Sequence, residues 1–123
     1  MDFIYDMIES KIYSEGQQKA LVDVDETICF YEGKRFYKDA IPKQENIDKI
    51  NKLYDEGWHI TYWTARGGTS KIDWYELTKE QLDSWGCKYH DIIVGHRESI
   101  FCHPLKPSFD LVVDDKAKRI EEL

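Results

Sequence analysis

Acidic side chains gather at two points along the 123-residue chain, each at the end of a short apolar run. Asp23 and Asp25 close the first run, and Asp114 and Asp115 close the last. Carboxylates gathered at one site repel each other unless a cation neutralises them, and a ligand set of oxygens alone favours Mg²⁺ over zinc or copper. The pattern therefore predicts a magnesium site lined by these four residues, with either member of the last pair as the direct ligand.

Groups suited to holding a phosphate lie between the two acidic pairs. Thr64 ends a run of β-forming residues and leads into Arg66, Gly67 and Gly68, and Lys106 precedes the last apolar run. A hydroxyl, the backbone amides of a glycine turn and an ammonium can all hold phosphoryl oxygens while charge moves. Arg66 suits a substrate carboxylate or second phosphate as well as it suits an exposed salt bridge.

The spacing of Asp23 and Asp25 allows the two carboxylates to divide the work of phosphoryl transfer. Asp23 is the candidate nucleophile, and Asp25 is the candidate acid that protonates the leaving oxygen and then activates water. Taken alone, such a pair after a strand is more often a turn or a helix cap. Thr64 alone would be a capping residue and Lys106 a surface lysine, so the prediction depends on the set in order.

The elements around these residues alternate between strand and helix. Apolar runs and three- and four-residue periodicities predict strands over 20–25, 58–65, 91–95 and 110–113, and helices over 1–17, 46–56 and 73–85, with a further helix at the C-terminus. Residues 28–42 are irregular and aromatic, and we call them the flap. This alternation predicts one α/β domain over 1–123 with a mainly parallel sheet, whose strand ends share one edge.

The motifs, taken together and in this order, resemble those of the haloacid dehalogenase-like (HAD) hydrolase superfamily. They span residues 19–117, and the stretches around Thr64 and Asp114 are further similar to small bacterial members associated with capsular-polysaccharide or sugar-phosphate metabolism. The resemblance implies a Rossmann-like three-layer sandwich, Mg²⁺ dependence and phosphatase activity. It also implies that Asp23 is the nucleophile, that Asp25 is the acid/base and lends its carbonyl to the metal, and that Lys106 holds the phosphate.

Two departures from the family pattern concern specificity and local geometry. Glu26 stands where glycine is commoner, and the segment 96–105 is longer than in the small relatives. The flap is too short for a folded cap domain, so we expect an open site, or one that a neighbouring copy covers in a homo-oligomer. The favoured function is hydrolysis of a small phosphomonoester, such as a sugar or polyol phosphate, through an aspartyl-phosphate. The alternatives are a non-catalytic phosphate-binding scaffold and a receiver-like signalling domain.

Composition and charge restrict the classes of partner and the cellular compartment that we expect for this protein. The formal net charge of −7 disfavours nucleic acid and anionic membrane surfaces, because phosphates are repelled on approach. No apolar run reaches the length of a membrane span, and the first residues do not resemble an export signal. Three cysteines form a sparse, odd set, which favours free thiols in a reducing cytoplasm. The spacing of Cys87, His90, Cys102 and His103 matches no common zinc pattern.

Overall fold

The computed structural model describes residues 16–67, 72–95 and 109–113. Within these ranges the chain forms an α/β fold around a four-stranded parallel sheet with the strand order β5-β4-β1-β6. The strands are β1 (Lys19–Asp23), β4 (His59–Thr64), β5 (Asp91–Val94) and β6 (Leu111–Val113). The predicted parallel sheet is confirmed, and its strand bounds differ by at most two residues from the sequence-based ranges.

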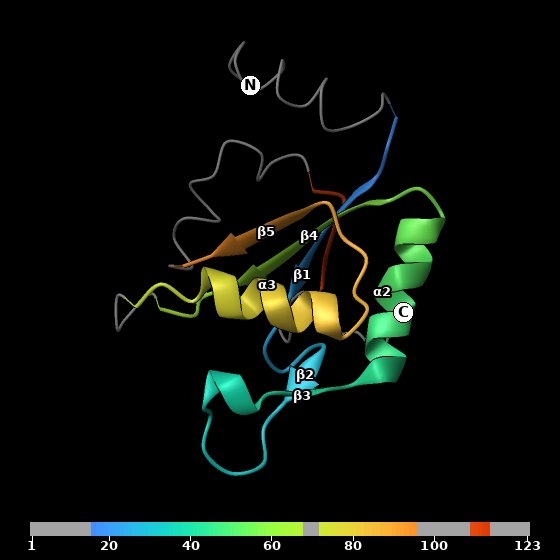
Figure 1. The fold of residues 1–123 in the computed structure, drawn as a ribbon. Coiled ribbons are helices and arrows are strands. Elements are labelled where there is room, and N and C mark those ends of the chain that lie inside the picture. Colours follow the sequence, from blue (N-terminus) through green and yellow to red (C-terminus); the bar gives the residue numbers. More distant parts are fainter. Residues whose placement is uncertain (1–15, 68–71, 96–108, 114–123) are drawn as a thin grey trace.

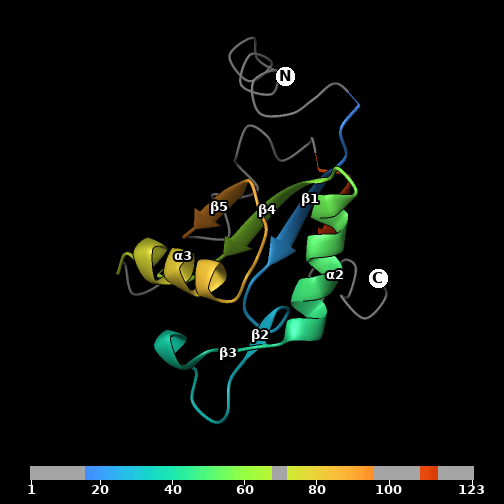
Figure 2. The same cartoon turned by 45° about the vertical axis from the view of Figure 1, so that its right-hand side comes forward.

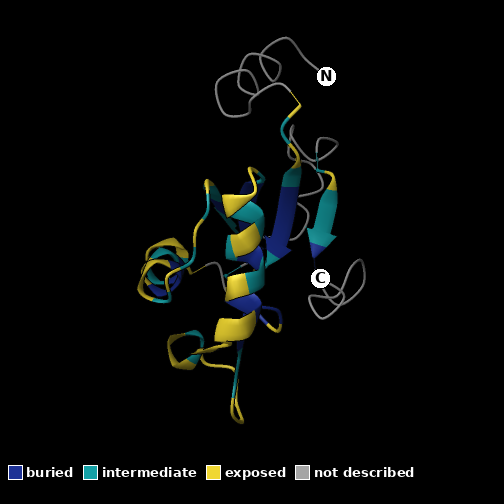
Figure 3. Ribbon diagram, turned by 90° about the vertical axis from the view of Figure 1, so that its right-hand side faces the viewer, coloured by how far each residue is buried: buried dark blue, intermediate teal, exposed yellow. Residues whose placement is uncertain are grey.

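Two helices cover one face of this sheet (Figures 1 and 2). The helix α2 (Gln44–Asp55) connects β1 to β4 by way of the flap, and α3 (Tyr75–Ser84) connects β4 to β5. Both lie on the same face because successive right-handed crossovers that advance in one direction place their helices on one side. In Figure 3 the outer side of α2 is exposed, whereas β1 beside it is buried. The expected N- and C-terminal helices fall outside the described residues.

The periodic apolar positions of the helices explain where the main core forms. Ile47 and Ile50 of α2 and Leu82 of α3 are fully buried and pack on Val22 and Tyr62 of the central strands. Burial of each aliphatic side chain of this size contributes about 1.5–3 kcal/mol. A smaller cluster on the opposite face of the sheet contains Leu21 and Trp63, with Ile93, Phe109 and Val112 against them. Among the described residues, that face carries no helix.

The flap is more regular than its sequence indicates, so the expectation of an irregular segment is wrong. Two-residue strands, β2 (Cys29–Phe30) and β3 (Ile41–Pro42), pair in antiparallel fashion, and a 3₁₀ turn, η1 (Tyr37–Asp39), lies between them. Proline is tolerated in β3 because β3 is an edge strand. Figure 2 shows the hairpin beyond the end of β1, so the flap lies at the edge where the parallel strands terminate.

Candidate active site

The sheet brings three of the predicted site residues to one edge. Asp23 is the last residue of β1 and pairs in register with Trp63, the neighbour of Thr64 at the end of β4. Asp25 follows two residues beyond β1, and its Oδ2 accepts a hydrogen bond from the Thr64 hydroxyl at 3.0 Å. Because neighbouring parallel strands end at the same edge, residues 39 positions apart in the chain become hydrogen-bonded neighbours.

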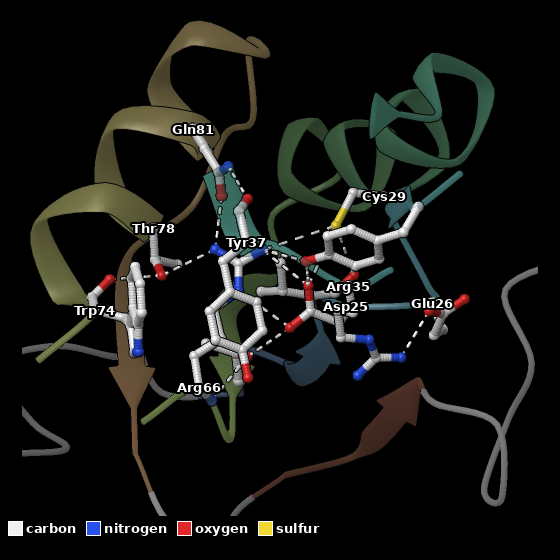
Figure 4. A network of polar contacts seen from close by, with 12 residues as sticks. Asp25, Glu26, Cys29, Arg35, Tyr37, Arg66, Trp74, Thr78 and Gln81 are labelled. Atoms are coloured by element: carbon white, nitrogen blue, oxygen red, sulfur yellow. Dashed lines mark hydrogen bonds and ion pairs between the residues drawn. The ribbon is translucent and has the colours of Figure 1, made fainter. Parts of the chain in front are cut away.

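Arg66 forms a buried ion pair with Asp25 (Figure 4). Its Nη2 donates to Asp25 Oδ1 at 2.8 Å and its Nε donates to Oδ2 at 3.1 Å, which is the two-point geometry that a guanidinium offers a carboxylate. Arg66 is 1% exposed and Asp25 8%. The structure therefore places the Arg66 guanidinium inside the protein and paired with Asp25, rather than in an exposed salt bridge.

Further donors occupy the remaining lone pairs of Asp25. The Tyr31 hydroxyl and the Cys29 thiol both donate to Oδ1, the thiol at 3.5 Å. Since a carboxylate has about four lone-pair positions, these donors, with Arg66 and Thr64, leave neither oxygen of Asp25 open. In this arrangement the carboxylate is a fully bonded anion at the centre of a network.

The network also determines how its members titrate. Burial alone raises the pKa of Asp25, but the hydrogen bonds and charge of Arg66, together with Tyr31 and Thr64, outweigh it and hold that pKa below the usual value. Burial also raises the pKa of the Tyr31 hydroxyl, and its hydrogen bond to Asp25 raises it further. The Cys29 thiol is shifted in the same direction by burial and by Asp25. Asp25 is thus ionised at neutral pH, and both neighbouring groups keep their protons.

The helix α3 fixes the other side of the guanidinium. Arg66 Nη1 donates to Gln81 Oε1 at 2.6 Å and to the Thr78 hydroxyl at 3.2 Å. Gln81 and Thr78 are both buried and lie one turn apart on α3. All three nitrogens of the Arg66 side chain therefore have acceptors, which satisfies a charge that would otherwise be costly to bury.

The turn after β4 needs its glycine for steric reasons. Gly67 has φ +83°, and a Cβ on this residue would lie 2.1 Å from the backbone oxygen of Ile72. Glu26, in the turn after Asp25, also lies in the left-handed region with φ +64°. This conformation gives a physical reason why glycine is favoured at that point of the turn. The Glu26 carboxylate bonds the Arg35 guanidinium at 2.6 Å on the exposed side of the flap.

Four of the predicted site residues, Gly68, Lys106, Asp114 and Asp115, lie outside the described ranges. Across residues 16–67, 72–95 and 109–113, no group of three or more His, Cys, Asp or Glu side chains is placed to hold a metal ion. Two oxygen donors of the hard type lie at this end of β1, the Asp23 carboxylate and the backbone carbonyl of Asp25, whereas the Asp25 carboxylate bonds Arg66 and Thr64. Both are the hard oxygen type that Mg²⁺ prefers, so these donors fit the metal.

Sequence reasoning did not find Tyr31, Thr78 or Gln81 as members of this site. Tyr31 lies in the flap, which the sequence marks only as irregular and aromatic, and Thr78 and Gln81 occupy ordinary positions of the helix predicted over 73–85. One signal was present: polar Thr78 and Gln81 lie on the same helical face as the apolar Leu82. Polar side chains on a buried face need buried partners, and Arg66 is the partner here.

Comparison with known proteins shows similarity in structure only. The chain matches no protein-family model and no curated protein. It is similar to the crystal structure of an MCSG structural-genomics target from Vibrio cholerae, with a TM-score of 0.62, 25% sequence identity, and 86% of each chain covered. That protein's name states no activity, so the similarity bears on the α/β fold. Among the described residues, no helix is long and apolar enough to cross a membrane.

Proposed function

We propose that this protein is a Mg²⁺-dependent phosphatase of the HAD type, with a Rossmann-like fold and no cap domain. Its substrate is a small phosphomonoester in the cytoplasm, such as a sugar, polyol or related metabolite phosphate used in capsule or polysaccharide synthesis. The observation that carries the proposal is the convergence of Asp23, Asp25 and Thr64 at the ends of two adjacent parallel strands. Ligands of open parallel sheets bind beyond this edge.

The residues divide the reaction as follows. The Asp23 carboxylate attacks phosphorus, an Asp23 O–P bond forms, and the bond to the leaving oxygen breaks. Water then attacks the aspartyl-phosphate and releases inorganic phosphate and the free carboxylate. Asp25, which is ionised in the free protein, takes up a proton from solvent or from the phosphate monoanion when the substrate displaces one of its present donors. It gives this proton to the leaving oxygen and accepts one from the attacking water in the second half of the cycle. The Thr64 hydroxyl and the backbone amides of the Gly67 turn hold the phosphoryl oxygens. Lys106, which lies outside the described residues, adds its ammonium group.

Mg²⁺ is the metal that this donor set fits. Asp23 and the Asp25 carbonyl would hold it from the described residues, and Asp114 or Asp115 would complete the set. When bound, the ion supplies positive charge that neutralises the carboxylates and the phosphate. The free thiols of Cys29 and Cys87 accord with a reducing compartment.

A phosphate-binding scaffold without turnover is the second candidate, and one observation favours it. Both oxygens of Asp25 accept hydrogen bonds from other side chains, which is the arrangement of a structural carboxylate. If this arrangement persists with a ligand bound, the Asp25 carboxylate cannot accept or donate the proton that the reaction requires. Affinity for phosphate without any release of phosphate would distinguish this candidate from the enzyme.

A phosphate-release screen over sugar, polyol, amino-alcohol and nucleotide monophosphates tests the proposed function. We expect release with Mg²⁺ and none after chelation of the metal. Asp23→Asn should lower kcat by at least about 10³-fold, because covalent catalysis is lost. The matched control is Asp48→Asn, a surface aspartate of α2 that bonds only Gln44 among its described contacts and should keep full activity. Full activity of Asp23→Asn would remove Asp23 as the nucleophile.

A further inference from the structure

The flap is attached to the Arg66–Asp25 pair near its first strand. The Tyr31 hydroxyl donates to Asp25 and accepts from Arg66 Nη2 at 3.1 Å. Tyr31 directly follows β2, so this contact fixes the beginning of the segment that joins β2 to β3. One end of the flap is therefore bonded to the same carboxylate that the proposed reaction uses.

The far side of the flap is attached to the same guanidinium by a different route. Gln81 Oε1 accepts from Arg66 Nη1 at 2.6 Å, and its Nε2 donates to the backbone oxygen of Tyr37 in η1 at 2.6 Å. The Tyr37 ring lies under Arg66, with 4.9 Å between the guanidinium carbon and the ring centroid, and meets the edge of Trp74 at 5.1 Å. Figure 4 shows Gln81, Arg66 and Tyr37 in this arrangement.

Gln81 is the hydrogen-bonding connection between α3 and the backbone of the flap in the described part of the chain. A third attachment, from Arg35 to Glu26, is about half exposed at both ends and is worth little for that reason. Gln81 is 9% exposed, and both halves of its amide are used. Its loss would leave the Tyr37 oxygen with the Ala40 N–H as its other donor among the described residues. Because the bond from Gln81 is part-buried, the connection through Gln81 is stronger than the exposed pair.

We propose that Gln81 is a positioning residue that holds the flap in a fixed place beside the strand ends, so that the flap acts as a preformed wall for the part of the substrate beyond the phosphoryl group. The proposal rests on the phosphatase function above and adds a specificity residue that touches no reacting atom. Holding a binding wall in place before the ligand arrives removes the entropic cost of ordering it on binding. Gln81 therefore affects the binding of large substrates more than the chemical step.

Hydrogen exchange and steady-state kinetics on the full chain test this inference together. In Gln81→Met we expect the amides of Asp39 and Ala40, which bond within η1, to exchange at least about tenfold faster. We also expect the KM for a bulky phosphomonoester from the screen to rise about tenfold more than the KM for acetyl phosphate in the same variant. Gln81→Glu serves as a second variant, because it keeps an acceptor for Arg66 but loses the donor to Tyr37, and should release the flap likewise.

Gln44→Met is the matched control, since Gln44 bonds only the exposed Asp48 among the described residues. It should change neither the exchange rates nor the kinetics. Unchanged exchange of Asp39 and Ala40 in both Gln81 variants would overturn the proposal. Equal losses on bulky and small substrates would also overturn it, because that result indicates a general loss of folded protein. Failure of the phosphatase function would appear separately, as a wild-type protein that releases no phosphate from any substrate.

Discussion

The parallel sheet carries one cluster of titratable side chains where its strands end and another where they begin. The first cluster buries charged groups as a pair, and the second keeps its buried group neutral. At the strand ends, Asp25 and Arg66 are both charged and both buried, and each is bonded on every side. At the strand beginnings, the buried His59 stacks on the exposed His90, with 4.4 Å between ring centroids. His90 Nδ1 accepts from the backbone N–H of Ile60 at 3.1 Å, so this nitrogen carries no proton.

The difference between the two clusters lies in the charge state of the buried side chains. Burial, with smaller contributions from the nearby His90 and Lys19, lowers the pKa of His59 to about 4, so this imidazole stays neutral at neutral pH. The other cluster keeps a charge in the interior by pairing it. A buried pair adds little net stability, because desolvation offsets the attraction. Stability alone therefore does not explain the pair, which lies at the end of the sheet where the proposed function puts the substrate.

The largest expected effect comes from removing one partner of the buried pair. Arg66→Met leaves the Asp25 carboxylate buried without its cation, and we expect a loss of about 3–5 kcal/mol in the free energy of unfolding. The matched control is Arg35→Met, which breaks the half-exposed pair with Glu26 and should cost less than about 1 kcal/mol. Urea unfolding of the two variants measures the contrast. Equal losses would show that Arg66 is not held as the structure describes.

The titration of His59 should dominate the pH dependence of stability at pH values above the range in which Asp25 titrates. The unfolded chain binds a proton at His59 below about pH 6.5, while the folded chain does so only near pH 4. Stability is therefore full above pH 6.5 and falls by up to about 3 kcal/mol as the pH drops to 4.

His59→Phe keeps an aromatic ring for His90 to stack on and should remove most of this slope, as urea titrations between pH 7 and 4.5 would show. The pKa of Asp25 lies below its usual value of 3.8, so its contribution is lost only at still lower pH. A slope that survives in His59→Phe would assign the transition to another group.

The smallest expected change in stability comes from substitutions in two turns, one after β1 and one before β4. The turn before β4 uses Gly57 at φ +99°, whereas the turn after Asp25 uses Glu26 at φ +64°. Glu26→Gly removes the strain of a side chain in this region and should stabilise the protein by about 0.5–1 kcal/mol, less whatever the exposed pair with Arg35 contributes. Gly57→Ala should destabilise it by about 1–2 kcal/mol. Thermal unfolding of both variants tests the opposite signs, and two changes of the same sign would contradict the described conformations.

The sheet was predictable from sequence because β1, β5 and β6 are short, largely apolar runs and β4 is rich in β-forming residues. The meeting of Asp25 with Thr64 followed because parallel strands end at the same edge. The burial of Arg66 was not predictable in the same way. Its partners Tyr31 and Gln81 lie 35 and 15 residues away on separate elements, and no local pattern marks them as a set. The flap hairpin was missed because two-residue strands with a proline give no alternation to detect.

The roles of Asp23, Lys106, Asp114 and Asp115 remain predictions from the sequence. Lys106, Asp114 and Asp115 lie outside the described residues. For Asp23, the structure supplies the position at the end of β1 and leaves the chemistry to experiment.

Trapping the covalent intermediate tests the central claim most directly. The protein would be mixed with Mg²⁺ and the best substrate of the screen, quenched in acid during turnover, digested and mapped by mass spectrometry. The account predicts a single phosphoryl group on the peptide that contains Asp23, absent from Asp23→Asn. Steady release of phosphate with the label on another residue, or with no labelled peptide at any quench time, would contradict it.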